Sequence, residues 1–167
     1  LGRIKGTIRM EDLKDADFVI EAVFEDLELK KNIFKQLDEL TRSGVILTSN
    51  TSSMSITEIA MSTKRREKVA GMHFFNPPQL MTLVEVIKGE STSQETVSTL
   101  TELARKLGKT PIIVRRDVRG FIVNRILGMA FNEAFWAFQR KEATKEGIDA
   151  SVKYTGGFPM GWFELAD

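Results

Sequence analysis

The hydrophobic pattern switches repeatedly between strand and helix spacing along the first part of the chain. Short runs rich in β-branched and aromatic residues predict strands, and these runs cover 17–23, 45–48, 69–73, 83–87 and 111–114. Between them, apolar residues recur at helical spacing with charges on the other face. This predicts helices over 26–40 and 94–107, and a short helix that begins at Ser55. Alternating strands and helices are typical of a parallel sheet covered on both faces.

The pattern changes near residues 117–120. Strand-like runs stop beyond Asp117, and two long helical patterns follow, over 121–140 and 144–153. We therefore expect an α/β domain over residues 1–118 and the beginning of an all-α domain over residues 119–167.

Composition excludes several function classes. The apolar fraction of 42% and the charged fraction of 28% are those of an ordinary globular protein. The net charge is +1, with 24 basic and 23 acidic residues, and nothing in this balance suggests a nucleic-acid partner. The absence of cysteine excludes disulfides, thiolate catalysis and cysteine-ligated metals. No run reaches the about 18 apolar residues of a membrane span, so a membrane is not an expected partner either.

The one histidine, His73, is the first candidate for acid–base chemistry. It ends a predicted strand, and open α/β sheets bind ligands beyond the carboxyl ends of their strands. Glu85 interrupts the apolar run 83–87, where an unpaired carboxylate is costly. The turn at Pro77 and Pro78 can fold this run back so that Glu85 reaches the imidazole. From the pattern alone, a second interpretation of Glu85 is equally favoured, namely a carboxylate at the edge of a strand that faces water.

Two polar segments follow strands and allow two interpretations each. Residues 49–53 come directly after a strand. Their pattern favours a polar turn with a helix cap, and the functional alternative is a loop that faces a ligand. Glu25 and Asp26, followed by Lys30 and Lys31, favour a solvated helix start, with acids at the N-terminus and bases later.

Asn124 is a further candidate, because it is a polar residue among apolar ones in the first turn of a long predicted helix. A buried side-chain amide needs hydrogen-bond partners. We expect either a cap or inter-domain hydrogen bond, or a contact to a ligand.

Six motifs in order resemble one known family. They are residues 18–27 (FVIEAVFEDL), 47–53 (LTSNTSS), 73–77 (HFFNP), 83–87 (LVEVI), 120–125 (GFIVNR) and 157–165 (GFPMGWFEL). This set closely resembles the 3-hydroxyacyl-CoA dehydrogenases, including the 3-hydroxybutyryl-CoA dehydrogenases. The resemblance implies a Rossmann-like domain, a helical domain that mediates homodimerisation, and transfer of hydride from C3 of an L-3-hydroxyacyl-CoA to NAD⁺.

The resemblance also implies roles for single residues. His73 is similar to the catalytic base and Glu85 to its partner. Ser52 is similar to the serine that touches substrate and nicotinamide, and Asn124 to the asparagine near the 3-oxygen of the substrate. Further positions similar to those around NAD are Ala22, Glu25, Lys30 and Asn50.

The chain departs from the family pattern in ways that set further expectations. No glycine-rich dinucleotide fingerprint occurs in the sequence. We therefore expect a chain truncated at both ends, with a Rossmann-like, mostly parallel sheet that lacks its first strands. We also expect this chain to bind NAD weakly, because the glycine-rich turn provides the main site for the pyrophosphate. Trp162 stands where the family commonly has proline, and Gly147 where it commonly has an acid. We expect a cytoplasmic or mitochondrial-matrix enzyme acting on acyl-CoA. The alternative is a non-catalytic fragment or a crystallin-like binding or structural relative.

Overall fold

The computed structural model describes residues 2–166 and divides the chain into two units. The first ends at Phe121 and the second begins at Ile122. No helix within residues 2–166 is long and apolar enough to cross a membrane.

A five-stranded sheet in the order β1-β2-β3-β4-β5 forms the centre of the first unit. The pairs β1–β2, β2–β3 and β4–β5 are parallel, and β4 runs antiparallel to β3. The mostly parallel sheet expected from the sequence is therefore confirmed, with each predicted strand in place. The strands are β1 (Phe18–Glu21), β2 (Ile46–Ser49), β3 (Val69–Phe74), β4 (Leu83–Ile87) and β5 (Thr110–Val114).

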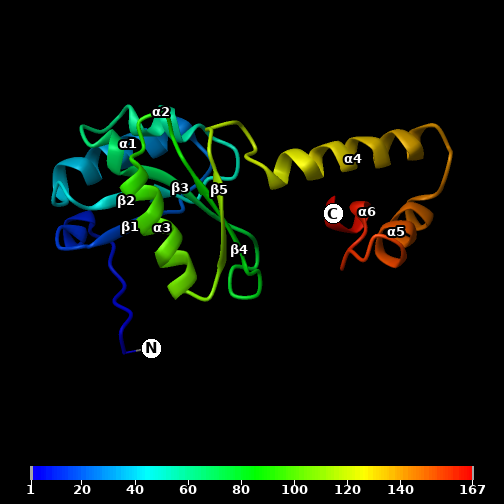
Figure 1. Cartoon of the computed structure of the whole chain (residues 1–167), viewed down its shortest axis with the longest axis horizontal. Coiled ribbons are helices and arrows are strands. Elements are labelled where there is room, and N and C mark those ends of the chain that lie inside the picture. Colours follow the sequence, from blue (N-terminus) through cyan, green and yellow to red (C-terminus); the bar gives the residue numbers. More distant parts are fainter. Residues whose placement is uncertain (1, 167) are drawn as a thin grey trace. The chain divides into compact units, whose positions relative to one another are not determined.

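Helices cover both faces of this sheet, and Figure 1 shows α3 (Gln94–Lys106) across one of them. Side chains alternate between two cores, because successive residues of a strand point to opposite faces. Leu47 joins the core that contains α1 (Leu27–Leu40) and α2 (Ile56–Ala60), whereas Ile46 joins the core that contains α3. The α/β layering predicted from the sequence is thus confirmed.

Each of these helices begins at a side-chain cap, which fixes where the preceding loop ends. Asp26, Ser55 and Ser93 accept hydrogen bonds from the backbone amides of Leu29, Glu58 and Thr96. Such caps satisfy amide groups that have no partner within the helix. Two short 3-10 segments, Met10–Leu13 and Arg66–Lys68, were not predicted from the sequence.

The second unit is helical, as predicted, and consists of α4 (Val123–Gln139), α5 (Lys145–Tyr154) and α6 (Trp162–Ala166). The short helix α6 was not predicted. Asp149 holds its N-terminus, because the two carboxylate oxygens accept hydrogen bonds from the amides of Phe163 and Glu164. A side chain at Gly161 would collide with Asp149, so this turn requires glycine.

Candidate active site

His73 and Glu85 face each other across the antiparallel pair of β3 and β4. They are direct cross-strand partners, and Nδ1 of His73 lies 2.8 Å from Oε2 of Glu85. His73 is 4% exposed and Glu85 is fully buried. The alternative interpretation of Glu85 as an edge carboxylate facing water is therefore wrong, because β5 covers the far side of β4 and the segment 75–82 returns the chain against β3.

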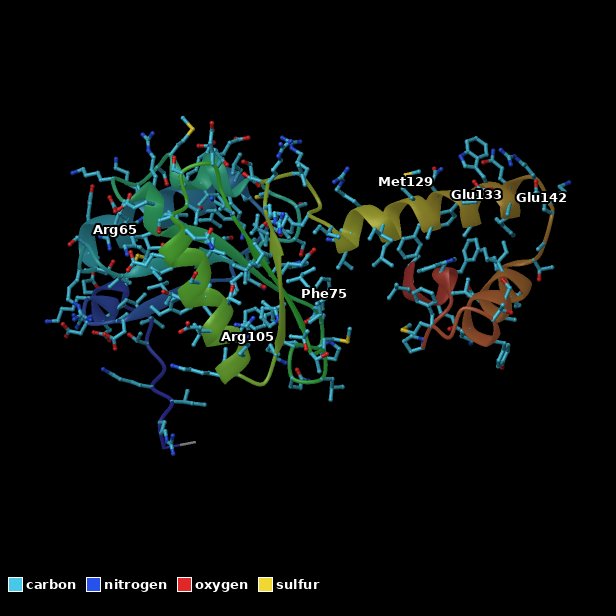
Figure 2. The ribbon with its side chains drawn as sticks, in the orientation of Figure 1. Arg65, Phe75, Arg105, Met129, Glu133 and Glu142 are labelled. Carbon is cyan, nitrogen blue, oxygen red and sulfur yellow. The ribbon has the colours of Figure 1, made fainter. Side chains whose placement is uncertain are left out.

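Two aromatic rings confine the imidazole of His73. The ring centroid of Phe75 lies 4.6 Å from that of His73, and the ring centroid of Phe121 lies 5.7 Å away. Phe75 is labelled in Figure 2, where its side chain lies beside the strands β3 and β4. Phe121 is fully buried and follows Gly120, and both have a positive φ, so a tight turn places this ring. Packing on the ring and a carboxylate on Nδ1 together restrict the imidazole to one orientation.

This arrangement suits general acid–base catalysis. A carboxylate on one ring nitrogen favours the tautomer that carries hydrogen there, which makes Nε2 the nitrogen that accepts a proton. The carboxylate then stabilises the imidazolium that forms.

The loop after β2 joins the carboxyl ends of three neighbouring strands. The amide of Asn50 donates to the backbone oxygen of Glu21 at the end of β1, over 2.8 Å. Oδ1 of Asn50 accepts from the amide of Phe74, also over 2.8 Å, directly after His73. The side chain of Asn50 therefore connects this loop to the strand that carries the histidine.

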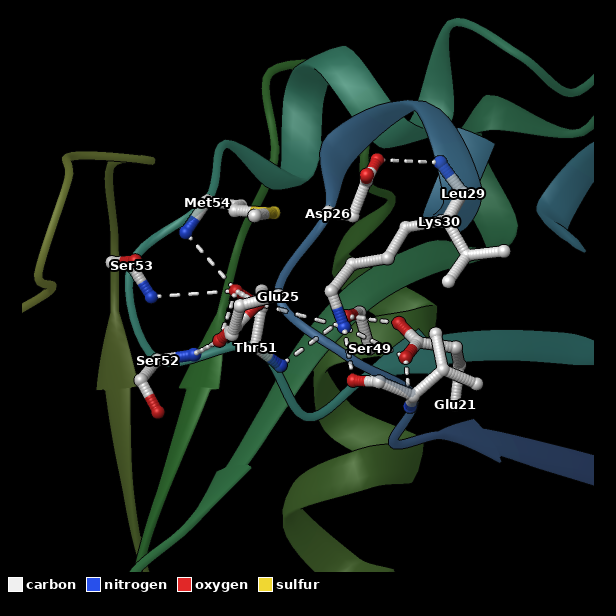
Figure 3. Close-up of polar contacts among 11 residues, drawn as sticks. Glu21, Glu25, Asp26, Leu29, Lys30, Ser49, Thr51, Ser52, Ser53 and Met54 are labelled. Atoms are coloured by element: carbon white, nitrogen blue, oxygen red, sulfur yellow. Dashed lines mark hydrogen bonds and ion pairs between the residues drawn. The ribbon is translucent and has the colours of Figure 1, made fainter. Parts of the chain in front are cut away.

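Glu25 holds the next residues of the loop (Figure 3). Both of its carboxylate oxygens accept from Oγ1 of Thr51, at 3.0 and 2.9 Å, and Oε1 accepts from the amide of Ser52 at 2.7 Å. The same Oγ1 accepts from the amides of Ser53 and Met54. The segment is thus a turn held by side-chain hydrogen bonds, and the helix that follows it is capped by Ser55, as predicted.

Lys30 corrects the interpretation of α1 as a solvated helix start. Its side chain is 1% exposed, and Nζ lies 2.7 Å from Oε1 of Glu21 and 3.1 Å from the backbone oxygen of Val23. Lys31 does follow the expectation, since it pairs with Glu28 at the surface. Lys30 is buried because the first turn of α1 packs over the end of β1, where Glu21 supplies an anionic partner.

Sequence reasoning missed Glu21 as part of the site, and it placed Ser49 in the loop after the strand, whereas Ser49 is the last residue of β2. Oε2 of Glu21 accepts from Oγ of Ser49 at 2.6 Å, and Oε1 accepts from the amide of Val23 at 2.6 Å. A signal was present, since Lys30 shares the helical spacing of Phe34 and Leu37, which are buried. A lysine on the apolar stripe of a helix indicates a buried anionic partner.

The remaining predicted residues lie as follows. Ala22 is exposed directly after β1, and Ser52 is half-buried. Asn124 is the second residue of α4 and belongs to the second unit. No group of three or more metal-ligating side chains gathers anywhere in residues 2–166.

The fold and the site define a class of protein: an α/β unit of the kind that binds nucleotides, with an acid–base pair at the carboxyl end of a strand. The NAD-binding domain of 3-hydroxyacyl-CoA dehydrogenase matches residues 1–118, and the C-terminal domain of 3-hydroxyacyl-CoA dehydrogenase matches residues 120–167. The chain belongs to the 3-hydroxyacyl-CoA dehydrogenase family, whose cofactor is NAD.

Individual relatives agree with this assignment. The chain is 50% identical to 3-hydroxybutyryl-CoA dehydrogenase of Clostridioides difficile over its whole length, covering 59% of that protein. It is 47% identical to the human mitochondrial hydroxyacyl-coenzyme A dehydrogenase over 90% of its length, covering 48% of that protein. The crystal structure of (S)-3-hydroxybutyryl-CoA dehydrogenase from Ralstonia eutropha matches 99% of the chain and 58% of its own, with a TM-score of 0.94 and 45% identity. The chain thus spans about half to three fifths of the length of these relatives.

Proposed function

We propose that the protein containing this chain oxidises an L-3-hydroxyacyl-CoA to the 3-ketoacyl-CoA with NAD⁺ as hydride acceptor. One observation carries the proposal: a buried histidine–glutamate pair, joined over 2.8 Å, at the carboxyl end of a strand in a chain of this family. The class of substrate follows from the names of the relatives, which are 3-hydroxyacyl-CoA and 3-hydroxybutyryl-CoA dehydrogenases.

The residues of this chain handle the proton of the reaction. Nε2 of His73 takes the proton of the 3-hydroxyl group as the C3–O bond becomes a carbonyl. Glu85 holds Nδ1 and stabilises the positive charge that develops on the ring. NAD⁺, when bound, accepts the hydride that leaves C3. The products are then the ketone, NADH and a protonated imidazole, which returns its proton to water.

The side chains at the ends of β1 and β2 fit part of the cofactor. Ala22 is exposed and small, Asn50 offers an amide, and Ser52 offers a hydroxyl. These groups suit the hydroxyls and the carboxamide of a nicotinamide riboside. Lys30 does not fit a direct contact, because its buried ammonium faces inward to Glu21. We propose that Asn124 contacts the 3-oxygen of the substrate. We also propose that the full-length protein is a homodimer of the cytoplasm or the mitochondrial matrix.

Turnover by the full-length protein tests this function. Purified protein is mixed with L-3-hydroxybutyryl-CoA and NAD⁺, and NADH is followed by its absorbance, with acetoacetyl-CoA and NADH for the reverse direction. We expect turnover in both directions. Folded protein that binds NADH and turns over neither substrate contradicts the proposal and favours the crystallin-like alternative.

Replacing Glu85 by glutamine is expected to lower kcat. Glutamine keeps the shape of the side chain but removes the negative charge that stabilises the imidazolium formed during the reaction. NADH affinity by fluorescence titration should stay within about threefold, because Glu85 faces the imidazole. If kcat stays within about threefold of the parent, Glu85 is only a structural residue.

A further inference from the structure

An ion pair that the proton-transfer chemistry does not use lies beneath the loop 50–53. Lys30 and Glu21 are each 1% exposed in their side chains and lie 2.7 Å apart. A second carboxylate, that of Glu25, lies 3.5 Å from the same ammonium and is 44% exposed. One buried ammonium therefore stands between two carboxylates at unequal distances (Figure 3).

The two carboxylates have different other partners. Glu21 accepts from Ser49 and from the amide of Val23, both within the end of the sheet. Glu25 accepts from Oγ1 of Thr51 and from the amide of Ser52, both in the loop. An ammonium that moved fully onto Glu25 would draw this carboxylate away from the position in which it meets the two loop donors, and hydrogen bonds weaken steeply when their geometry is lost.

Four consecutive amides of the loop depend on this arrangement. The amide of Thr51 donates to Ser49, that of Ser52 to Glu25, and those of Ser53 and Met54 to Thr51. The hydroxyl of Thr51 is itself fixed by Glu25. The position of Ser52 thus rests on the oxygens of Glu25 remaining available to the loop.

We propose that Glu21 is a positioning residue, which holds the ammonium of Lys30 against the end of β1 and thereby leaves Glu25 to fix Ser52. The role of Ser52 in the reaction rests on the proposed function, whereas the placement of the loop does not. Glu21 acts through Lys30 and Glu25 and touches no reacting atom.

Stability alone does not account for this pair. Taking two charges out of water costs about as much as their attraction returns, so a buried pair is weak evidence for stability. A second buried pair, Arg65 with Asp38, lies 2.7 Å apart at the C-terminal end of α1 (Arg65 is labelled in Figure 2). Arg65 also donates to backbone oxygens there, at the opposite end of α1 from Lys30. It provides a matched control.

The test measures hydrogen exchange in the loop of the full-length protein, by mass spectrometry on peptides covering 50–54. Three variants are compared with the parent: Glu21→Gln, Glu21→Gln with Lys30→Met, and the control Asp38→Asn. In Glu21→Gln, Lys30 turns to Glu25, so we expect exchange about 10-fold faster or more, the scale of a lost hydrogen bond to a charged group. In the double variant Glu25 keeps its loop donors, so exchange returns to within about threefold of the parent.

The control separates loop placement from loss of stability. Asp38→Asn should lower the melting temperature yet leave loop exchange within about threefold of the parent. Steady-state kinetics give a second readout. In Glu21→Gln, kcat should fall about 10-fold, while KM for the acyl-CoA stays within about threefold of the parent value. In the double variant, kcat should recover. An inactive parent would refute the proposed function while the exchange data still decide the role of Glu21.

Unchanged loop exchange in Glu21→Gln overturns the proposal, and so does an equal acceleration in Asp38→Asn. If Glu21→Gln fails to fold, the double variant decides. Slow loop exchange in it supports the proposal, because the loop then holds without the buried charges, and fast exchange overturns it.

Discussion

Replacing His73 by glutamine in the full-length protein is expected to lower kcat by about 10²–10⁴-fold, the usual contribution of a positioned general base. Glutamine retains a polar side chain near Glu85 but takes up no proton at neutral pH. The backbone pairing of β3 with β4 does not involve the imidazole, so the fold should persist. Steady-state kinetics measure the effect, with the melting temperature and NADH affinity as checks on folding and binding.

A double variant sharpens this test. If Glu85 acts through the imidazole, His73→Gln with Glu85→Gln should be no slower than His73→Gln alone, because residues that act as a unit are not additive. A kcat for His73→Gln within about threefold of the parent would show that another group takes the proton.

Replacing Arg65 by methionine is expected to lower the free energy of unfolding of the first unit by about 3–5 kcal/mol, as for a broken buried ion pair. Arg65 is 7% exposed, and its guanidinium donates to Asp38 and to backbone oxygens of Asp38, Thr41 and Arg42. The oxygen of Asp38 belongs to the last turn of α1, and those of Thr41 and Arg42 directly follow its end. Carbonyl groups in the last turn of a helix have no amide partner within it. Methionine fills the space but leaves the buried carboxylate of Asp38 without its cation.

Urea unfolding followed by circular dichroism measures this loss. The neighbouring Arg66 is exposed, so Arg66→Met serves as a control and should change the unfolding free energy by no more than about 0.5 kcal/mol. Equal effects of the two variants would contradict a specific role for the buried guanidinium.

Much of the fold was predictable because its hydrophobic spacing is regular. The strand at 45–48 and the helix at 26–40 each bury one continuous apolar pattern, and the caps at Ser55 and Ser93 carry local signals. The contact of His73 with Glu85 could also be predicted from the sequence, because a carboxylate in an apolar run needs a partner and the chain has one histidine.

Other features depend on partners that lie far apart in the sequence. The helical spacing of Lys30 with Phe34 and Leu37 indicates burial, but only the packing of α1 on β1 identifies Glu21 as its partner. Helix α6 is five residues long, and the amide of Phe163 near its start donates to Asp149, fourteen residues earlier in the chain. Such elements have too little local pattern to be predicted, since tertiary contacts supply most of their stability.

The cross-strand position of Glu85 also determines where the chain tolerates insertions and deletions. His73 and Glu85 lie on the face of the sheet that α1 and α2 cover, with Val69 and Ile87. A single residue inserted between Leu83 and Glu85 would turn Glu85 to the face of Met72, Val84 and Leu100, where a carboxylate meets an apolar core. The same insertion within 76–82 lies outside both strands and leaves the pairing intact. Length variation among relatives of this chain should therefore fall in that connection, which separates the base from its carboxylate in sequence while keeping them opposite each other in space.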